Sequence, residues 1–214
     1  MQLYGVDFSP FVQRVLIAAR IKGHDLPLAP LPGGSMRSEE YAAMSPMRRI
    51  PHLVDGDTHV CESGVIVDYL DRVLIGPPLW PEEPAARARA LSIERIAEVE
   101  IAAGLRPFVN AMLGRPVDPA ILEAARGQIA RGAQGIEALL RAGDSYAAGE
   151  APGAADALLI ALFALAGIVA AREGAGMLGD RPKLAALGSR LLADRLGADA
   201  RGAMATGFAR MAAR

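Results

Sequence analysis

The segment Ser45–Leu70 reads SPMRRIPHLVDGDTHVCESGVIVDYL and holds the most specific structural pattern in the chain. The largely apolar run His52-Leu53-Val54 is followed by Asp55-Gly56-Asp57, a sequence typical of tight hairpin turns, so Thr58–Cys61 is predicted to return as an antiparallel strand. Glu62-Ser63 then opens a predicted helix whose apolar residues recur at helical spacing. The segment therefore predicts a hairpin that leads directly into a helix.

Two polar attachment points lie at neighbouring ends of this predicted sheet. A cis Ile50-Pro51 bond, which X-Pro bonds adopt at low cost, would turn the Ile50 N–H and C=O outward, where they could pair with an extended peptide. Ser63 as N-cap would offer free N–H groups, a hydroxyl and the positive end of the helix dipole to a ligand carboxylate. The alternative is an ordinary proline turn followed by an ordinary capped helix.

The first 75 residues mix strands and helices. Capping and periodicity predict strands at 2–6 and 26–31 and helices that start at Pro10 and Ser38, in addition to the hairpin and the Ser63 helix. The resulting order, βαβαββα, is the thioredoxin-like pattern. Residues 76–84 then hold four prolines and a glycine, which is too rigid and too poor in donors for a helix interior and predicts a linker.

The chain beyond the linker is rich in Ala, Leu, Arg and Glu, which predicts an all-helical domain with helices at 85–113, 119–141, 153–172, 182–196 and 200–213. Its most apolar run, 157–171, is shorter than the roughly 20 residues of a membrane span and has no polar face, so we expect a helix buried on all sides. The predicted fold class is α+β, with a thioredoxin-like domain at 1–75, a Pro-rich linker at 76–84 and an all-helical domain at 85–214.

Composition excludes several functional classes. A chain of 214 residues with 52% hydrophobic composition can bury about 70% of its unfolded surface, so it needs no disulfide or metal to stabilise its core. Its 23 basic and 24 acidic residues give a net charge of −1, which offers no electrostatic basis for binding nucleic acid or an anionic membrane. A single cysteine, Cys61, and no N-terminal signal pattern predict a cytoplasmic protein without disulfides, and no ligand spacing predicts a metal site.

Three motifs in the same order resemble the glutathione transferases. Ser9–Val15 (SPFVQRV) is similar to the catalytic segment of the serine-type branch, Ser45–Pro51 loosely matches the lead-in to the family's cis-proline, and Glu62-Ser63 matches the pair that opens the next helix. The resemblance covers the whole chain, because the family also places a thioredoxin-like domain before a helical one. One departure is Gly153, which replaces the usual Ser or Thr cap of the central helix while Asp156 is kept, at a cost of roughly a few tenths of a kcal/mol.

The resemblance implies a glutathione transferase that activates the thiolate of glutathione, its co-substrate, for attack on small hydrophobic electrophiles, a detoxification reaction. Ser9 would donate its hydroxyl to the sulfur, and lowering the thiol pKa by ~2 units requires roughly 2.7 kcal/mol of preferential thiolate stabilisation. The other implied glutathione-binding residues are Phe11, Arg49, Ile50, Pro51, Glu62 and Ser63. The residue that binds the glycyl carboxylate of glutathione could be Arg37, Arg49 or His52. The alternative for Ser9 is a plain cap of the helix at Pro10.

The second substrate is implied to bind against the helical domain, at Phe8, Leu105, Phe108, Met112 and Phe208, with Phe11 and Met211 as further candidates. An apolar surface of this kind favours broad acceptance of electrophiles, since nothing polar selects one substrate. Plain core packing is the alternative for these residues. The resemblance also implies a homodimer in which the Ser63 helix faces the helical domain of the partner.

Other functions and other residues are less favoured. A non-catalytic ligand-binding or regulatory module with the same fold is the rival function. An isomerase or a dehalogenase is weaker, and Phe8-Ser9-Pro10 is not the Ser-Ser-Cys segment of the isomerase branch. A cysteine-type thiol oxidoreductase is weaker still, because residue 9 is serine. Arg14 is expected to tie the first helix to the domain boundary. Tyr4 is expected in the core, Cys61 is expected to be a buried inert thiol, and His24 and His59 have no partners at ligand spacing.

Overall fold

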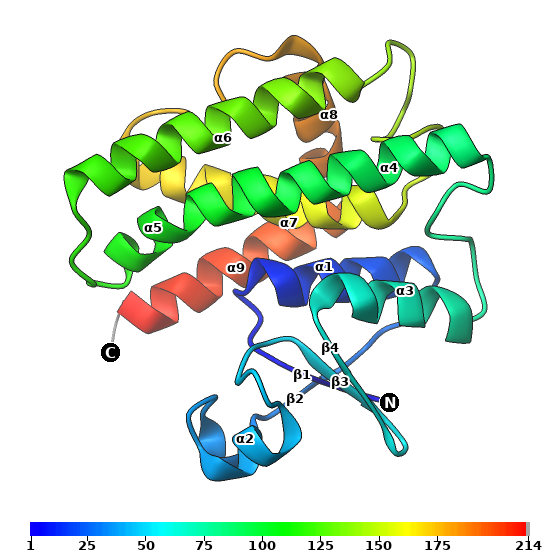
Figure 1. The fold of residues 1–214 in the computed structure, drawn as a ribbon, viewed down its shortest axis with the longest axis vertical. Helices are drawn as coiled ribbons and strands as arrows, with labels where there is room; N and C mark the ends of the chain where they lie inside the picture. The colour runs from blue at the N-terminus through cyan, green and yellow to red at the C-terminus, as the bar shows by residue number, and fades with distance from the viewer. Residues whose placement is uncertain (213–214) are drawn as a thin grey trace.

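The computed structural model describes residues 1–212. Its N-terminal domain contains the predicted βαβαββα order (Figure 1), namely β1 (Gln2–Tyr4), α1 (Pro10–Ile21), β2 (Leu28–Ala29), α2 (Glu39–Met44), β3 (His52–Asp55), β4 (Thr58–Cys61) and α3 (Ser63–Val73). A short 3-10 turn at Pro32–Gly34 precedes α2. The α+β prediction is confirmed, although β1 and β2 are shorter than the strands expected at 2–6 and 26–31.

The four strands form one mixed sheet in the order β2-β1-β3-β4. β1 runs parallel to β2 and antiparallel to β3, and the hairpin pairs Leu53 with Val60. Leu3, Leu53 and Val60 point to the buried face, which α1 and α3 cover, while α2 lies on the other side of the sheet (Figure 1). The predicted antiparallel return at Gly56-Asp57 is therefore confirmed.

The remainder of the described chain is helical, as predicted. The elements are α4 (Pro84–Ile96), a π-helical segment η2 (Ala97–Ala102), α5 (Ala103–Met112), α6 (Pro119–Leu139), α7 (Ala154–Glu173), α8 (Pro182–Ala193) and α9 (Arg195–Ala212). The expected helix at 85–113 contains the π-helical segment. The last helix starts five residues earlier than expected, because Asp194 interrupts α8 and its carboxylate accepts a hydrogen bond from the Arg195 N–H at 2.6 Å. Ala213, the expected end of α9, lies outside the described residues.

Helix α7 lies at the centre of the molecule, between α1, α4, α8 and α9 (Figure 1). Its residues from Ala154 to Ala166 are buried without exception, as its uniform apolar sequence predicts. The helix is long and apolar enough to span a membrane, but 78% of its most apolar window is buried inside the fold. A core helix accounts for its composition.

The cap of α7 compensates for the missing hydroxyl at Gly153. Asp156 accepts hydrogen bonds from the Gly153 N–H at 3.0 Å and from the Ala147 N–H at 2.8 Å. A Cβ at Gly153 would approach the Leu79 carbonyl oxygen to 2.6 Å, so the close approach of the interdomain segment favours glycine there. The Ala154 N–H donates to that same Leu79 oxygen at 2.9 Å.

Candidate active site

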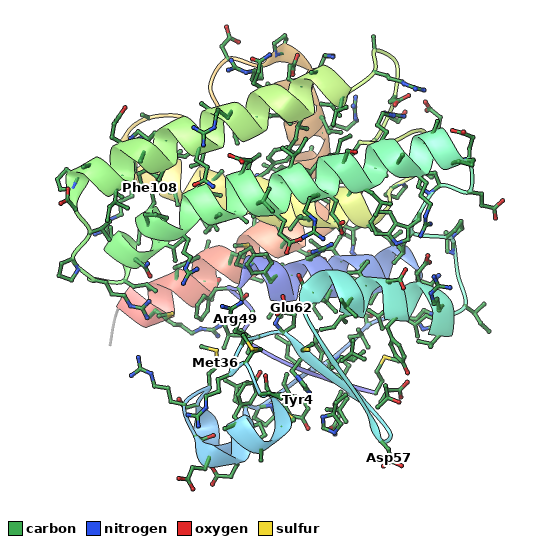
Figure 2. All side chains as sticks on the ribbon, viewed as in Figure 1. Tyr4, Met36, Arg49, Asp57, Glu62 and Phe108 are labelled. Carbon is green, nitrogen blue, oxygen red and sulfur yellow. The ribbon has the colours of Figure 1, made fainter. Side chains whose placement is uncertain are left out.

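A cavity of about 460 Å³ opens between the N-terminal domain and the helical domain. One wall, which we call the thioredoxin wall, comes from the N-terminal domain, and its lining residues include Phe8, Ser9, Phe11, Met47, Arg49, Ile50, Pro51, Cys61, Glu62 and Ser63. The opposite side, which we call the helical wall, consists of Glu98, Val99, Ala102, Ala103, Arg106, Val109, Leu165 and Phe208. Figure 2 labels Arg49 and Glu62, which both line this cavity.

Ser9 lies at the N-terminus of α1 and lines the cavity. Its Oγ accepts a long hydrogen bond of 3.5 Å from the Val12 N–H, so the serine caps the helix weakly. A hydroxyl both accepts and donates, and this cap uses only its acceptor capacity. The cap and the donation to a thiolate are therefore compatible roles, and the alternative reading of Ser9 as a cap does not exclude the catalytic one.

The Ile50-Pro51 peptide bond is cis, as the sequence suggested, and it leads directly into β3. Within the described residues, the Ile50 N–H and C=O make no backbone hydrogen bond. Both Ile50 and Pro51 line the cavity. The preceding turn is fixed by Tyr41, whose hydroxyl donates to the Arg49 carbonyl oxygen at 2.7 Å. The site thus offers one unpaired donor and one unpaired acceptor at the edge of the cavity.

The second attachment point differs from the expectation in one respect. Ser63 is the first residue of α3 and not its N-cap, a position that Glu62 occupies without a side-chain capping bond. Glu62 has φ 66° and ψ 120°, and residues other than glycine rarely adopt a positive φ of this kind. Glu62 is exposed and lines the cavity together with Ser63, so the N-terminus of α3, where the first N–H groups have no partner within the helix, lies at the same cavity.

The buried side chain of Arg14 positions Ser63 through a hydrogen bond. Its guanidinium is fully buried and donates to Ser63 Oγ at 3.1 Å. It also pairs with Glu94 of α4 and lies 3.7 Å from Glu98 of η2. Burial lowers the pKa of Arg14 to about 10, against the opposing effect of Glu98. The expectation that Arg14 ties the first helix to the domain boundary is confirmed.

The three candidates for a carboxylate of glutathione lie in different places. Arg49 is exposed and lines the cavity. Arg37 is exposed but outside the cavity lining, and His52 is buried on the sheet, where its Nε2 lies 3.1 Å from His59 Nδ1. Burial, together with the neighbouring His59, lowers the pKa of His52, so its imidazole is neutral at pH 7. Arg49 is therefore the best placed cation of the three.

The predicted second-substrate residues divide into two groups. Phe8 and Phe208 line the cavity, and their rings pack with centroids 5.3 Å apart. Leu105, Phe108 and Met112 do not line it, which corrects the prediction: Leu105 and Phe108 are buried, and Met112 packs against the core. Phe108 lies toward α6 (Figure 2), with the Arg126 guanidinium 4.9 Å above its ring.

The error has a simple geometric cause, because neighbouring residues on a helix point about 100° apart. Ala102, Ala103 and Arg106 line the cavity, whereas the neighbouring Ile101, Gly104 and Leu105 are buried. A Cβ at Gly104, for example, would approach Ile129 of α6 to 2.5 Å. Phe11 lines the cavity as expected, and Met211 is half-buried outside the lining.

Several lining residues were missed or misjudged from sequence. Arg106 and Leu165 were not predicted, and no motif in the chain distinguishes them from their neighbours. Cys61 is exposed and lines the cavity, contrary to the expectation of a buried thiol. Tyr4 is only half-buried, and its hydroxyl donates to Gln2 Oε1 at 2.6 Å, so it is not a core residue. Among residues 1–212, no group of three or more His, Cys, Asp or Glu side chains could hold a metal ion.

This arrangement can bind a short peptide-like thiol. Unpaired backbone groups at Ile50, a helix N-terminus with a serine hydroxyl and two charged side chains, Arg49 and Glu62, would bind the backbone and the charged ends of the thiol. Ser9 lines the same cavity and can stabilise a thiolate. The largely apolar helical wall would hold a second reactant beside the sulfur.

Comparison with known proteins gives the same class. Residues 3–77 match the family model described as "Glutathione S-transferase, N-terminal domain". Glutathione S-transferase 3 of Zea mays is 34% identical over 169 residues, which cover 73% of this chain and 74% of the maize protein. Probable maleylacetoacetate isomerase 1 of Drosophila melanogaster is 33% identical over 155 residues, and the match spans 69% of this chain but only 59% of that relative.

A solved structure is similar over nearly the full length. The crystal structure of maleylacetoacetate isomerase from Methylobacterium extorquens AM1, with bound malonate and glutathione, has a TM-score of 0.75 and 30% sequence identity. The match covers 94% of this chain and 96% of that one. The chain therefore belongs to the glutathione S-transferase family. The prediction of a glutathione-dependent enzyme is confirmed at the level of the family, and these comparisons give no support to a non-catalytic module.

Proposed function

We propose that this protein transfers electrophilic carbon groups to the sulfur of glutathione, with Ser9 as the thiolate-stabilising donor. The observation that carries the proposal is that Ser9, Ile50-Pro51 and Glu62-Ser63 line one cavity. Glutathione would pair with the free backbone groups of Ile50, place one carboxylate at Ser63 and the N-terminus of α3, and place its ammonium group at Glu62. Arg49 would bind the glycyl carboxylate.

Thiolate stabilisation follows from the position of Ser9. The hydroxyl proton is free to point to the sulfur, and the N-terminal N–H groups of α1 add the positive end of the helix dipole. A depression of the thiol pKa by ~2 units corresponds to roughly 2.7 kcal/mol, within reach of one charge-assisted hydrogen bond acting with the dipole. The serine is a hydrogen-bond donor and not the nucleophile.

The test is turnover on a panel of electrophiles with Ser9→Ala, Ser9→Thr and Ser92→Ala. Ser92 is exposed on α4, and among residues 1–212 its hydroxyl bonds only the Ala88 carbonyl oxygen, so it is a matched control. We expect Ser9→Ala to reduce kcat/KM at least tenfold, Ser9→Thr to retain part of the activity and Ser92→Ala to retain all of it. Unchanged turnover in Ser9→Ala would remove Ser9 from the mechanism.

A second candidate function is glutathione-dependent isomerisation, because the Drosophila relative and the Methylobacterium structure are named maleylacetoacetate isomerases. A thiolate that adds reversibly to a conjugated double bond allows rotation about that bond before it leaves again. The two reactions differ in stoichiometry, since conjugation consumes one thiol per turnover and isomerisation consumes none. Titration of free thiol alongside substrate loss therefore distinguishes them on any one substrate.

A homodimer is the proposed assembly. Two apolar side chains, Val65 of α3 and Leu91 of α4, are 57% and 40% exposed and give each domain apolar surface for a partner. We expect sedimentation equilibrium at micromolar concentration to give a dimer and Val65→Glu to weaken it, while Ile121→Glu on α6 leaves it unchanged. A wild-type monomer would contradict the assembly.

The proposed location is the cytoplasm, where the exposed Cys61 thiol stays reduced.

A further inference from the structure

Arg106 is an uncompensated positive charge on the helical wall. The wall has two charged residues, and Glu98 is the other. Glu98 is balanced by Arg14 at 3.7 Å and by Arg95 at 3.6 Å. Arg106, by contrast, forms no ion pair and no side-chain hydrogen bond anywhere in residues 1–212, although its side chain is exposed to the cavity.

The two charges on the wall do not pair with each other. Among residues 1–212, the cations within ion-pair distance of Glu98 are Arg14 and Arg95, and Arg106 is not one of them. The lining residues around Arg106 on the wall, among them Ala102, Ala103 and Val109, are apolar and offer it no acceptor side chain.

An ordinary solvated arginine would lie on the outer surface, as Arg115 does just beyond α5. Arg115 is exposed, lies outside the cavity and donates to Asn110 Oδ1 at 2.8 Å. Arg106 instead opens to the space where the second reactant is expected. A planar guanidinium beside apolar side chains matches a carboxylate in bidentate geometry and is weakly hydrated, so it suits recognition of an organic anion.

We propose that Arg106 binds a carboxylate of the electrophile, so that the preferred substrates are electrophilic carboxylates and not neutral hydrophobic molecules. This inference rests on the proposed function, and it replaces the sequence-based expectation that nothing polar selects the substrate. It also has a kinetic reason: a thiolate repels an anionic electrophile, and a cation on the opposite wall offsets that repulsion. Arg106 is then a substrate-binding residue that determines specificity.

The proposal is tested with two probes that share the same reacting carbon, 4-(chloromethyl)benzoate, which is an anion, and its methyl ester, which is neutral and one methyl group larger. In both, the glutathione thiolate attacks the benzylic carbon, a C–S bond forms, and chloride leaves with the electrons of the C–Cl bond. The thiol proton has already passed to solvent. Chloride release therefore reports the same step for both probes.

We expect wild type to prefer the acid over the ester in kcat/KM, and Arg106→Met to lower kcat/KM for the acid roughly tenfold through KM. The ester should change less than threefold, and Arg115→Met should leave both probes unchanged. Equal loss on both probes, or no loss on either, would overturn the role of Arg106.

Equilibrium binding separates this inference from the proposed function. With S-methylglutathione bound, the unreactive 4-ethylbenzoate and its methyl ester are titrated into wild type and Arg106→Met by calorimetry. We expect wild type to bind the acid more tightly than the ester and the variant to lose that preference. If neither probe is turned over but this preference is found, the proposed conjugation fails while the Arg106 site stands. If the preference is absent from wild type, the Arg106 site is overturned whatever the turnover.

Discussion

At the scale of single residues, Glu62 combines a destabilising backbone conformation with a carboxylate that lines the cavity. Glu62 has a left-handed φ of 66° although it is not glycine, and its side chain makes no capping bond in return. Conformations of this kind cost of order 1–3 kcal/mol and persist where function requires them. The sequence predicted Glu62 and Ser63 as a pair but not this geometry, because backbone dihedrals at a strand-to-helix junction depend on how both elements pack.

Because of the backbone conformation at Glu62, we expect a glycine at this position to stabilise the fold and to weaken glutathione binding. Glu62→Gly should raise the free energy of unfolding by about 1 kcal/mol, because glycine adopts positive φ freely, and should weaken glutathione binding by removing the carboxylate. Glu62→Gln keeps the dihedral angle and loses the charge, so it should lower affinity with stability near wild type. Urea unfolding and glutathione titration measure both quantities. A Glu62→Gly variant that is less stable than wild type would contradict this account.

At the scale of elements, helix periodicity explains which predictions of the site succeeded. Phe8 and Phe208 were placed correctly because one lies in a loop next to Ser9 and the other on the terminal helix that packs over that loop. Leu105 and Phe108 were placed on the wrong face of α5, an error of one residue in register. Sequence gives the period of a helix but not its rotation about its axis, and the π-helical segment at 97–102 shifts that rotation further.

Helix α9 forms part of the cavity through its contact with the loop that carries Ser9. A Cβ at Gly207 would approach Phe8 Cβ to 2.6 Å, and Arg210 pairs with Asp7 nearby. Gly207→Ala should therefore push α9 away, displace Phe208, cost about 1–3 kcal/mol of stability and raise KM for the electrophile several-fold. KM for glutathione should change less than KM for the electrophile, since the proposed glutathione-binding residues Ile50, Glu62 and Ser63 lie on the thioredoxin wall.

Gly202 provides the matched control for this substitution. It lies on the same helix, is exposed, and a Cβ there would meet nothing within 4 Å. Gly202→Ala should keep both KM values and raise stability by roughly 0.5–1 kcal/mol, since alanine is the better helix former. If the two alanine variants behave alike in steady-state kinetics, the contact between Gly207 and Phe8 does not shape the cavity.

The start of α7 makes stability depend on pH. Burial raises the pKa of Asp156 to about 6, against the opposing effect of its backbone donors. A carboxyl whose pKa is raised in the fold stabilises the protein fully below its unfolded value of 3.8, and this contribution is lost as the pH rises to about 6. Relative to Asp156→Asn, wild type should lose about 3 kcal/mol of stability across the whole titration, of which about 2 kcal/mol falls between pH 4 and pH 6.5.

Chemical denaturation of both proteins between pH 4 and pH 6.5 measures this difference. The asparagine variant is the reference because its side chain has nearly the same shape and does not titrate. A stability difference that grows in favour of wild type with rising pH would show that the Gly153 and Ala147 N–H donors outweigh burial and lower the pKa instead.

At the scale of the whole molecule, the two domains form one site because buried polar contacts fix their junction. Arg14 of α1 pairs with Glu94 of α4 across the domain boundary, and Lys22 donates to the Pro77 carbonyl oxygen of the linker at 3.1 Å. The sequence predicted the order of the elements, and its local motifs predicted Ser9, Pro51 and Ser63, which line the cavity. It did not predict Arg106, because a cavity between domains is defined by residues that no local pattern connects.

The central claim is that Ser9 lowers the pKa of the glutathione thiol, and the most direct test is the ultraviolet absorbance of the bound thiolate against pH. Wild type and Ser9→Ala are titrated at saturating glutathione, with Ser92→Ala as the control. We expect the bound thiol to titrate ~2 units below free glutathione in wild type and in Ser92→Ala, and at or near the free value in Ser9→Ala. A bound thiol that titrates like free glutathione in wild type, or one that stays depressed without the Ser9 hydroxyl, would contradict the account.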